Sequence, residues 1–406
     1  MTLAPLMAPH TSTNVRRARG AVSLLFFTNG AIFASMVPWY PVIKVDLGLS
    51  NAALGLAVAA FPLGALLAGL SAGLLVRRFR SSRVAVVATI FATVATLLAG
   101  IAPSWAVIAG GLFVAGAMDS LADVAQNSHG LRVQRLYGRS ILNSFHAVWS
   151  IGAVAGGAAG AVAAGLGVSR TLHFVLIAVM CVVLAILSHR FLLRGSDPLP
   201  DDAATDAGVG MAKGSVRSRT WSLSRYGTLL LLVMIGSAGA LMEDAGNSWS
   251  AIYLTEGFGA SALVAGTGFI ALQGMQVVGR LLSDRLVDRF GQHSVARSAG
   301  LIVLVGMGLA LGFPSLVGSI IGFGLAGLGA APLIPAAVHA ADGLPGFRQG
   351  EALTIVSWLL RLGFLVSPPV VGWVADVSSL RLGLFLVPVA GLLVIIFSRV
   401  LGNKPR

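Results

Sequence analysis

The sequence contains little charge and a single cysteine. Charged residues make up 11% of its 406 residues, whereas hydrophobic residues make up 56%. A soluble domain carries roughly a quarter charged residues because it needs a wettable exterior, so this composition excludes an ordinary soluble globule. Cys181 stands alone in an apolar stretch, which excludes a disulfide framework and a cysteine-based metal site. We expect no metal and no cofactor.

Acidic residues are scarce in particular. The chain has 15 Asp and Glu against 28 Lys and Arg, which gives a net charge of +13. Such a surplus can indicate a nucleic-acid partner, but here the arginines lie in short gaps between apolar stretches, without interleaved aromatic residues that would stack on bases. We therefore expect no nucleic-acid partner, and we assign the arginines to the membrane surface, where they meet anionic lipids.

Long apolar stretches dominate the rest of the chain. A helix needs roughly 20 apolar residues to cross the hydrocarbon core of a bilayer. This criterion predicts twelve spans, near residues 20–41, 51–75, 84–104, 105–129, 142–166, 170–193, 226–252, 262–285, 296–313, 316–339, 353–375 and 380–401.

The arginines occupy every second gap between these spans. They precede the first span and follow the second, fourth, sixth and eighth, whereas the intervening gaps hold only Lys44, Arg170 and Arg381 as basic residues. Cytoplasmic loops of membrane proteins carry this excess of Lys and Arg, and translocated loops do not. The pattern predicts that both termini are cytoplasmic.

A polar segment divides the spans into six and six. Residues 195–225 contain prolines, glycines, four aspartates and a basic run, and cannot bury enough apolar surface to fold alone. We interpret them as a cytoplasmic linker between an N-terminal half, residues 1–194, and a C-terminal half, residues 226–406. Two joined six-span halves place a substrate site near the bilayer midplane between them.

The gap after the eighth span carries a recognisable motif. It runs from Gly279-Arg280 through Asp284 to Asp288-Arg289-Phe290-Gly291. This segment resembles the cytoplasmic loop signature of the major facilitator superfamily. The resemblance implies an all-α polytopic membrane protein with 12 transmembrane helices in two six-helix halves, and a loop that latches the helix ends in one conformation.

The first half departs from that signature at the matching gap. It reads Arg77-Arg78-Phe79-Arg80, with Arg77 where the family usually has Asp and Arg80 where it usually has Gly. The resemblance makes the residues of both gaps candidates for gating, namely Arg77, Arg280, Asp284, Asp288 and Arg289. Asp284 is expected to pair with Arg280 or Arg285.

Other segments resemble narrower groups. Asp123-Val-Ala-Gln-Asn127, followed by Arg139, Asn143, His146, Trp149 and Gly152, is similar to the fucose–proton symporter group. The segments 243–249 and 367–372 resemble the bacterial YbjJ subgroup. The fucose group also has an acid in its first span, where this chain offers only Asn29. The resemblance implies a multi-pass transporter of the bacterial cytoplasmic (inner) membrane.

Several polar residues lie within the predicted spans. An ionisable side chain at bilayer depth costs roughly 2.5–3.5 kcal/mol on insertion scales, so it must face the bundle interior or a watery cavity. Residues four apart share a helical face, which predicts one polar stripe from Asp119, Asp123 and Asn127 and another from Glu243 and Asn247, beside Asp244. In the family, spans one, four, seven and ten line the central cavity, so the two stripes would face each other.

The acids of these stripes are the candidates for proton coupling: Asp123, Glu243, Asp119 and Asp244. Burial in a low dielectric favours the neutral carboxyl, which suits a group that binds and releases a proton. The alternative is structural, a fixed ion pair of Asp123 or Glu243 with Arg280 or Arg361.

Candidate substrate-binding residues lie on the same and neighbouring spans: Asn29, Trp39, Asn127, Asn143, His146, Asn247, Trp249, Gln273 and Arg361. Two interpretations stay open for some of them. His146 serves equally well in a core hydrogen bond, and Trp39 and Trp249 suit the aromatic belt at the membrane surface.

These features favour a secondary active transporter that moves a small polar solute by alternating access, coupled to protons. One alternative is a drug-efflux antiporter, whose Gly-rich fifth span usually ends in Gly-Pro, whereas this fifth span has no proline. Another is a non-transporting membrane receptor. No nucleophile–base pair or phosphate loop stands in a suitable context, so we do not expect an enzyme. The expected partners are a small-molecule substrate, protons and the lipid bilayer, and we expect a monomer.

Overall fold

The computed structural model describes residues 13–195, 223–342, 344–347 and 351–402. In these residues the regular structure is α-helix with short 3-10 turns, and no strand is present. Twelve helical segments within the described ranges are long and apolar enough to cross a membrane. The predicted number of spans and their predicted order are therefore confirmed.

Eight elements form the first six spans: α1 (Thr13–Met36), η1 (Val37–Trp39) and α2 (Tyr40–Asp46) in the first span, then α3 (Asn51–Phe79), α4 (Ser81–Gly100), α5 (Trp105–Tyr137), α6 (Leu142–Gly165) and α7 (Arg170–Phe191). The remaining spans are α9 (Leu223–Phe258), α10 (Ala262–Phe290), α11 (Gln292–Gly312), α12 (Leu316–Ala330) with α13 (Leu333–Asp342), α14 (Glu351–Leu359) with α15 (Arg361–Val377), and α16 (Leu380–Leu384) with α17 (Leu386–Phe397) and η2 (Ser398–Leu401).

Several helices differ from the predicted spans in length or continuity. The predicted span 105–129 continues to Tyr137, because polar residues that favour helix extend it beyond the apolar window. The tenth span is interrupted between α12 and α13, where Pro332 and Pro335 have no N–H to donate to the preceding turn. The eleventh is interrupted at Leu360, one residue before Arg361.

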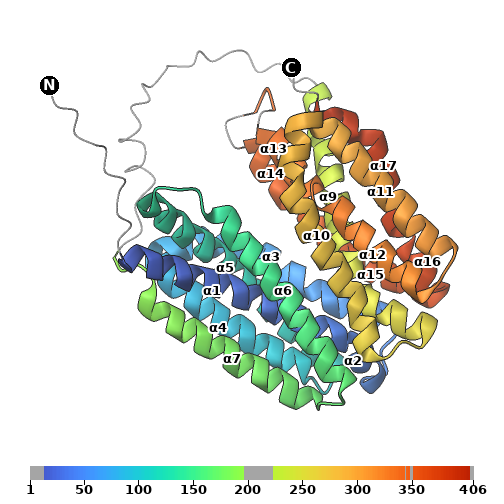
Figure 1. Ribbon diagram of the computed structural model, residues 1–406, viewed down its shortest axis with the longest axis horizontal. Helices are drawn as coiled ribbons and strands as arrows, with labels where there is room; N and C mark the ends of the chain where they lie inside the picture. Colours follow the sequence, from blue (N-terminus) through green and yellow to red (C-terminus); the bar gives the residue numbers. More distant parts are fainter. Residues whose placement is uncertain (1–12, 196–222, 343, 348–350, 403–406) are drawn as a thin grey trace.

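The helices form two groups that meet along part of their length (Figure 1). Within the first group, α3 packs on α5 and α1 on α6; within the second, α10 packs on α12 and α11 on α17. Contact between the groups runs mainly through α3 against α15 and α6 against α10. We call α1–α7 the first half and α9–η2 the second half; the exact domain boundaries stay a prediction, and most of the predicted linker lies outside the described residues.

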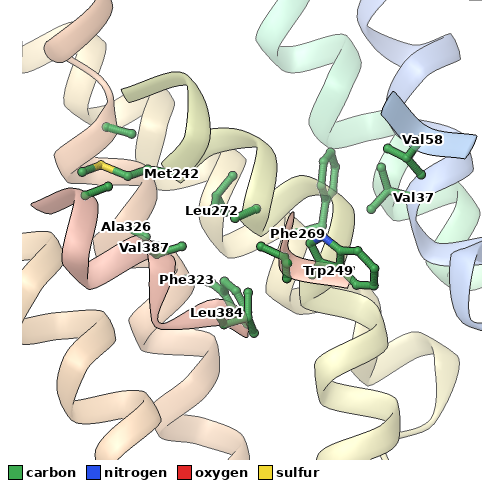
Figure 2. Packing of buried hydrophobic residues seen from close by; sticks show 14 of the residues in the cluster. Val37, Val58, Met242, Trp249, Phe269, Leu272, Phe323, Ala326, Leu384 and Val387 are labelled. Carbon is green, nitrogen blue, oxygen red and sulfur yellow. The ribbon is translucent and has the colours of Figure 1, made fainter. Parts of the chain in front are cut away.

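The halves converge at one end and diverge at the other (Figure 1). The end near α2 and α16, where the halves meet, is called the closed end. The opposite end, where α1 begins and α7 ends, is called the open end. An apolar cluster extends from the second half into the first half, and Figure 2 shows Trp249 and Phe269 directed toward Val37 and Val58. A separate cluster, which includes Val15 and Leu192, lies wholly in the first half.

Small residues allow the close approach of the halves at the closed end. A Cβ added to Gly55 of α3 would overlap the carbonyl oxygen of Pro368 in α15, and one added to Gly372 would overlap that of Asn51. Lipid is as apolar as the side chains, so van der Waals contact between closely spaced backbones drives such helix packing. Large apolar side chains such as Leu70 and Trp373 remain exposed on the outer surface, which suits a bilayer as solvent.

The corner between α3 and α4 carries an unusual backbone. Arg80 has φ 75° and ψ 141°, and Gly291 at the matching corner between α10 and α11 has φ 79° and ψ 157°. Glycine adopts this region freely, whereas a residue with a Cβ is strained there by about 1–3 kcal/mol. The first half thus keeps the corner geometry of the second half with an arginine in the glycine position.

Replacing Arg80 with glycine is expected to stabilise the protein. Arg80→Gly removes the Cβ strain at the corner, and we expect a gain of about 1 kcal/mol, less than the full strain because glycine is more flexible in the unfolded chain. The apparent melting temperature in detergent measures the change. Arg78→Gly is the control, because Arg78 lies within α3 and its loss of helix propensity costs about 1 kcal/mol. A melting temperature lowered equally in both variants would show that the corner is unstrained.

Candidate functional site

A cavity of about 310 Å³ lies between the two halves. It is lined by side chains from α1, α3, α5, α6, α9 and α15, so both halves form its wall. The lining consists of Asn29, Phe33, Phe61, Pro62, Ala65, Asp119, Ser120, Asp123, Trp149, Glu243, Asp244, Asn247, Arg361 and Phe364. All four candidate acids of the sequence analysis therefore reach one cavity.

Asn29 connects three helices of the first half. Its Nδ2 donates to Asp119 Oδ1 at 2.7 Å, and its Oδ1 accepts from Trp149 Nε1 at 2.7 Å. Asn29 is buried in α1, Asp119 belongs to α5 and Trp149 to α6. The amide thus holds the Asp119 carboxylate in place and fixes the indole that forms part of the cavity wall.

Asp123 lies one turn further along α5, is exposed and lines the same cavity. Asn127 Nδ2 donates to Asp123 Oδ1 at 2.8 Å, and His146 Nε2 lies 3.2 Å from Asn127 Oδ1. The predicted stripe is present on one face of α5, since Asp119 and Asp123 line the same cavity and Asn127 hydrogen-bonds to Asp123. Asp123 combines access to water with a donor that holds one of its oxygens.

Glu243 has a different environment in the second half. Its side chain is 7% exposed, its Oε2 accepts from Gln276 Nε2 at 2.6 Å, and Arg280 Nη2 lies 3.8 Å from the same oxygen. Of the ion pairs considered from the sequence, this one is present. Arg280 therefore pairs with Glu243 and not with Asp284. Asp284 makes no ion pair among the described residues, so the expected pairing of Asp284 with Arg280 or Arg285 is wrong.

Asp244, the neighbour of Glu243 in α9, is 9% exposed. Ser248 Oγ lies 3.4 Å from Asp244 Oδ1, whereas Asp244 Oδ2 is buried without a hydrogen-bond partner in the described part of the chain. Asn247 Oδ1 accepts from Gln273 Nε2 at 2.9 Å. Gln273 is 1% exposed and thus positions Asn247 instead of facing the cavity.

Arg361 is the cation of the cavity wall in the second half. It begins α15, and its guanidinium extends toward the first half, where a Cβ added to Gly69 would lie 3.7 Å from Nη1. It lies within electrostatic range of Asp119 and Asp123 but makes no ion pair or hydrogen bond among the described residues. The alternative of a fixed Asp123–Arg361 pair is therefore not realised in this conformation.

Some predicted binding residues lie away from this cavity. Trp39 and Trp249 are 3% and 1% exposed and belong to the apolar cluster near the closed end, so neither lines the cavity or lies in an exposed aromatic belt. Asn143 is exposed near the start of α6. Three further lining residues, Phe33, Phe61 and Phe364, could not be predicted from the sequence, because helical aromatics show no period that distinguishes cavity from core.

Comparison with known proteins identifies the family. The family model described as Major Facilitator Superfamily matches residues 22–281 and 244–406. The chain belongs to the major facilitator superfamily. Members of this superfamily are transporters and not enzymes, so the chain is a multi-pass membrane transporter.

Individual proteins agree with this membership. The chain is 28% identical over 357 residues to an uncharacterized MFS-type transporter of Yersinia pestis, with 88% of each protein covered. A structure of the nucleoside transporter NupG matches with a TM-score of 0.74 at 14% identity, over 95% of this chain and 100% of that one. A D-xylose-proton symporter matches with a TM-score of 0.73 at 15% identity, over 95% and 97%. At these identities the two structures establish the fold alone.

The superfamily loop residues lie near the open end of the molecule. Asp284, Asp288 and Arg289 are exposed and line a second pocket, which α13 borders with Pro335 and His339. Arg77, at the matching place in the first half, is exposed and has no ion pair among the described residues. A gating role for these residues stays a prediction.

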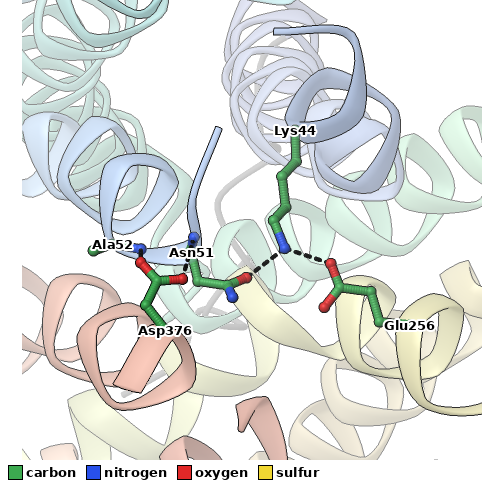
Figure 3. Close-up of polar contacts among 5 residues, drawn as sticks. All are labelled: Lys44, Asn51, Ala52, Glu256 and Asp376. Atoms are coloured by element: carbon green, nitrogen blue, oxygen red, sulfur yellow. Dashed lines mark hydrogen bonds and ion pairs between the residues drawn. The ribbon is translucent and has the colours of Figure 1, made fainter. Parts of the chain in front are cut away.

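A polar clasp joins the halves at the closed end, and Figure 3 shows its residues: Lys44, Asn51, Ala52, Glu256 and Asp376. Lys44 Nζ pairs with Glu256 of the second half and donates to Asn51 Oδ1 at 2.6 Å. The Asp376 carboxylate accepts the backbone N–H groups of Asn51 and Ala52, each at 2.8 Å. A carboxylate from one half therefore caps the positive N-terminus of a helix in the other half.

The clasp residues were not predicted from the sequence, although the basic residues in the charge-poor gaps were one indication. Lys44, Arg170 and Arg381 are the basic residues of the charge-poor gaps, and each has a structural partner. Lys44 pairs with Glu256, Arg170 Nη1 lies 3.3 Å from Asp46 Oδ2, and Arg381 Nε donates to the carbonyl oxygen of Leu311 at 2.6 Å. An exception to the charge pattern thus indicated a specific contact.

The Glu243–Arg280 pair predicts a non-additive effect on stability. Arg280→Gln leaves the buried Glu243 carboxylate with Gln276 but without its cation, and we expect a cost of about 1–3 kcal/mol for the loss of this charged partner. We expect a lowered melting temperature in detergent for Arg280→Gln, and recovery of most of the loss in Glu243→Gln/Arg280→Gln. Arg285→Gln, at an exposed position on the same helix, is the control. Equal effects of Arg280→Gln and Arg285→Gln would contradict the pair.

Proposed function

We propose that this protein is a secondary active transporter that moves a small polar solute by alternating access, coupled to protons. The observation that carries the proposal is the gathering of four carboxylates, from α5 and α9, in one small cavity between the halves. Acids at membrane depth are costly and usually functional. The polar amides beside them suit a solute with hydroxyl or carboxylate groups.

The four acids divide into distinct roles in this proposal. Glu243 is compensated by Arg280 and Gln276, which suits a fixed charge. Asp123 is exposed to the cavity and lacks a cation in contact, which suits a group that takes up and releases a proton. Asp119 and Asp244 are the further candidates, since each is held by one neutral donor. The amide of Asn127 and the ring of His146 extend the polar chain from Asp123 toward the open end.

The arginine-rich gaps supply the proposed orientation. The corners at Arg77–Arg83 and Asp284–Arg289 lie at the open end, together with the described chain ends. By the positive-inside rule we place this end, and both termini, in the cytoplasm of a bacterial inner membrane. The structure then represents the state open to the cytoplasm.

Within the superfamily we propose a relationship to the YbjJ subgroup and, more distantly, to the fucose–proton symporters.

One chain supplies all the walls of the cavity, so we propose the monomer as the working unit. Native mass spectrometry that detected an obligate dimer would contradict this.

A second candidate function is efflux of lipophilic compounds. The aromatic part of the lining, Phe33, Phe61, Trp149 and Phe364, favours it. Increased resistance of a sensitised host that overexpresses the protein, without transport of any polar solute, would support efflux.

The clasp is the proposed gate on the outer side, and breaking it is expected to expose buried seam residues. In a Cys181→Ser background, Val58→Cys introduces a thiol at a site that is 7% exposed. Adding Lys44→Glu places two acids together and breaks the ion pair with Glu256. An exposed ion pair contributes up to about 1 kcal/mol, which corresponds to a roughly fivefold change in the population of the open gate. We therefore expect a membrane-impermeant maleimide to label Val58→Cys in intact cells roughly fivefold faster. Adding Glu256→Lys restores the slow rate.

Arg170→Glu is the matched control for this experiment, because the Arg170–Asp46 pair lies within the first half. It should leave the labelling rate of Val58→Cys unchanged. Failure of Lys44→Glu to change the rate would contradict the gate. No labelling of Val45→Cys, at a largely exposed position, in intact cells would contradict the orientation.

Proton coupling predicts a pH change inside proteoliposomes when a transported solute is added. We expect Asp123→Asn to abolish solute-driven proton movement, because the amide cannot take up and release a proton. Exchange of solute between equal concentrations inside and outside the proteoliposomes should continue. Asp342→Asn, an exposed position outside the cavity, is the control. The proposal fails if no transported solute moves protons, or if coupling persists in Asp123→Asn combined with Asp119→Asn.

A further inference from the structure

Most polar side chains of the cavity wall have a hydrogen-bond partner among the described residues, whereas Ser120 and Arg361 have none. Asp119, Asp123 and Glu243 each accept a side-chain donor, and Asn247 accepts from Gln273. The guanidinium of Arg361 and the Oδ2 atom of Asp244 have no such partner. The Asp244 atom is buried, and buried polar groups are nearly always satisfied, whereas Arg361 is half-exposed and offers free donors to the cavity. Together the two groups indicate what a bound solute can supply.

Arg361 is placed to bind an acceptor from the solute. The interruption at Leu360 starts α15 at this residue, and the guanidinium reaches α3 of the first half, where a Cβ added to Gly69 would lie in ordinary contact with Nη1. Phe364 lies one turn further along the same face and also lines the cavity. A guanidinium presents its donors as a planar fork that matches a carboxylate through two parallel hydrogen bonds.

Asp244 is placed to bind a donor. Its side chain is more than nine-tenths buried, it lines the same cavity, and the nearby Ser248 reaches only Oδ1. Ser367 of α15 is also near this carboxylate, but its hydroxyl makes no hydrogen bond in the described part of the chain. An ionised carboxylate is acceptor-only, so its free oxygen requires a hydroxyl or ammonium group. A site that is built to bind such a group strongly rejects analogues that lack it, because its own buried atom is then left unpaired.

We propose that Arg361 binds a carboxylate of the substrate while Asp244 accepts a hydrogen bond from a hydroxyl or ammonium group of the same molecule, so that the cargo is a small hydroxy or amino carboxylate. This inference rests on the proposed transport function and names its substrate class. The cavity of about 310 Å³ is at the small end of the roughly 300–1,000 Å³ typical of ligand pockets. Phe33 and Phe61 offer apolar surface to the carbon skeleton of such a solute.

The electrostatics of the first half fit this assignment. Asp119 and Asp123 lie within range of the Arg361 charge without touching it. When either acid takes up a proton, Arg361 loses a competing negative charge and attracts the substrate carboxylate more strongly. Protonation and substrate binding therefore favour each other, which is the linkage that co-transport of a proton and an anion requires.

Thermal stabilisation of the purified full-length protein tests the class. The probes are D-gluconate, L-lactate and L-serine, compared with sorbitol, which lacks the carboxylate of gluconate, and hexanoate, which lacks its hydroxyls. We expect at least one of the three carboxylates to raise the melting temperature at millimolar concentration, and sorbitol and hexanoate to have no effect. Arg361→Gln and Asp244→Asn should each weaken that binding on the order of 10- to 100-fold, as expected for loss of a charged hydrogen bond.

Arg285→Gln is the control for removal of a positive charge. Arg361→Lys keeps the charge but lacks the planar guanidinium, so it should bind the carboxylate with intermediate affinity. Gel filtration and the melting temperature without solute show whether each variant folds; if Arg361→Gln does not fold, Arg361→Lys decides the test. The proposal is overturned if none of the three carboxylates stabilises the wild type, if sorbitol stabilises it as well as gluconate, or if binding is the same in the Arg361 variants.

Flux in proteoliposomes separates this inference from the proposed function. Binding of a carboxylate that depends on Arg361, without any transport, would keep the ligand class and contradict the transporter. Proton-coupled transport of a neutral solute that is unchanged in Arg361→Gln would keep the transporter and contradict the ligand class.

Discussion

The cost of a charged group inside a bilayer constrains the whole structure. An isolated ionised side chain at this depth must find a partner, a polar cavity or water. The chain meets this constraint by placing its intramembrane acids and arginines on the surfaces where the two halves face each other. The outer surfaces carry large apolar side chains instead. The polar cavity is therefore a consequence of where charge is tolerated, and a transport site can form only there.

The same constraint explains how the halves are held together. Hydrophobic burial gives little driving force between helices in lipid, so the seam depends on close backbone contact at Gly55 and Gly372 and on the polar clasp at the closed end. The clasp is modest in energy because Glu256 is partly exposed. A weak, partly exposed joint is consistent with the proposed alternating access, in which the halves separate at that end.

Much of the fold could be predicted from the sequence because its signals are local. Apolar length predicted the twelve spans, and the four-residue spacing predicted the stripe of Asp119, Asp123 and Asn127. The partners across the molecule could not be predicted in this way. Asp376 caps a helix that begins 325 residues earlier in the chain, and no local pattern links the two. Arg280 pairs with Glu243 and not with the nearby Asp284, because the carboxylate that is buried beside it gains more from the contact.

The proposed transport requires the two halves to alternate between access to opposite sides of the membrane. Distances between spin labels test it most directly, in a Cys181→Ser background, with one pair at the exposed Val45 and Val377 of the closed end and another at the exposed Leu136 and Phe290 of the open end. Alternating access predicts that acidic pH with a transported solute lengthens the first distance and shortens the second. Two distances that stay fixed, or that change in the same direction, would contradict the account.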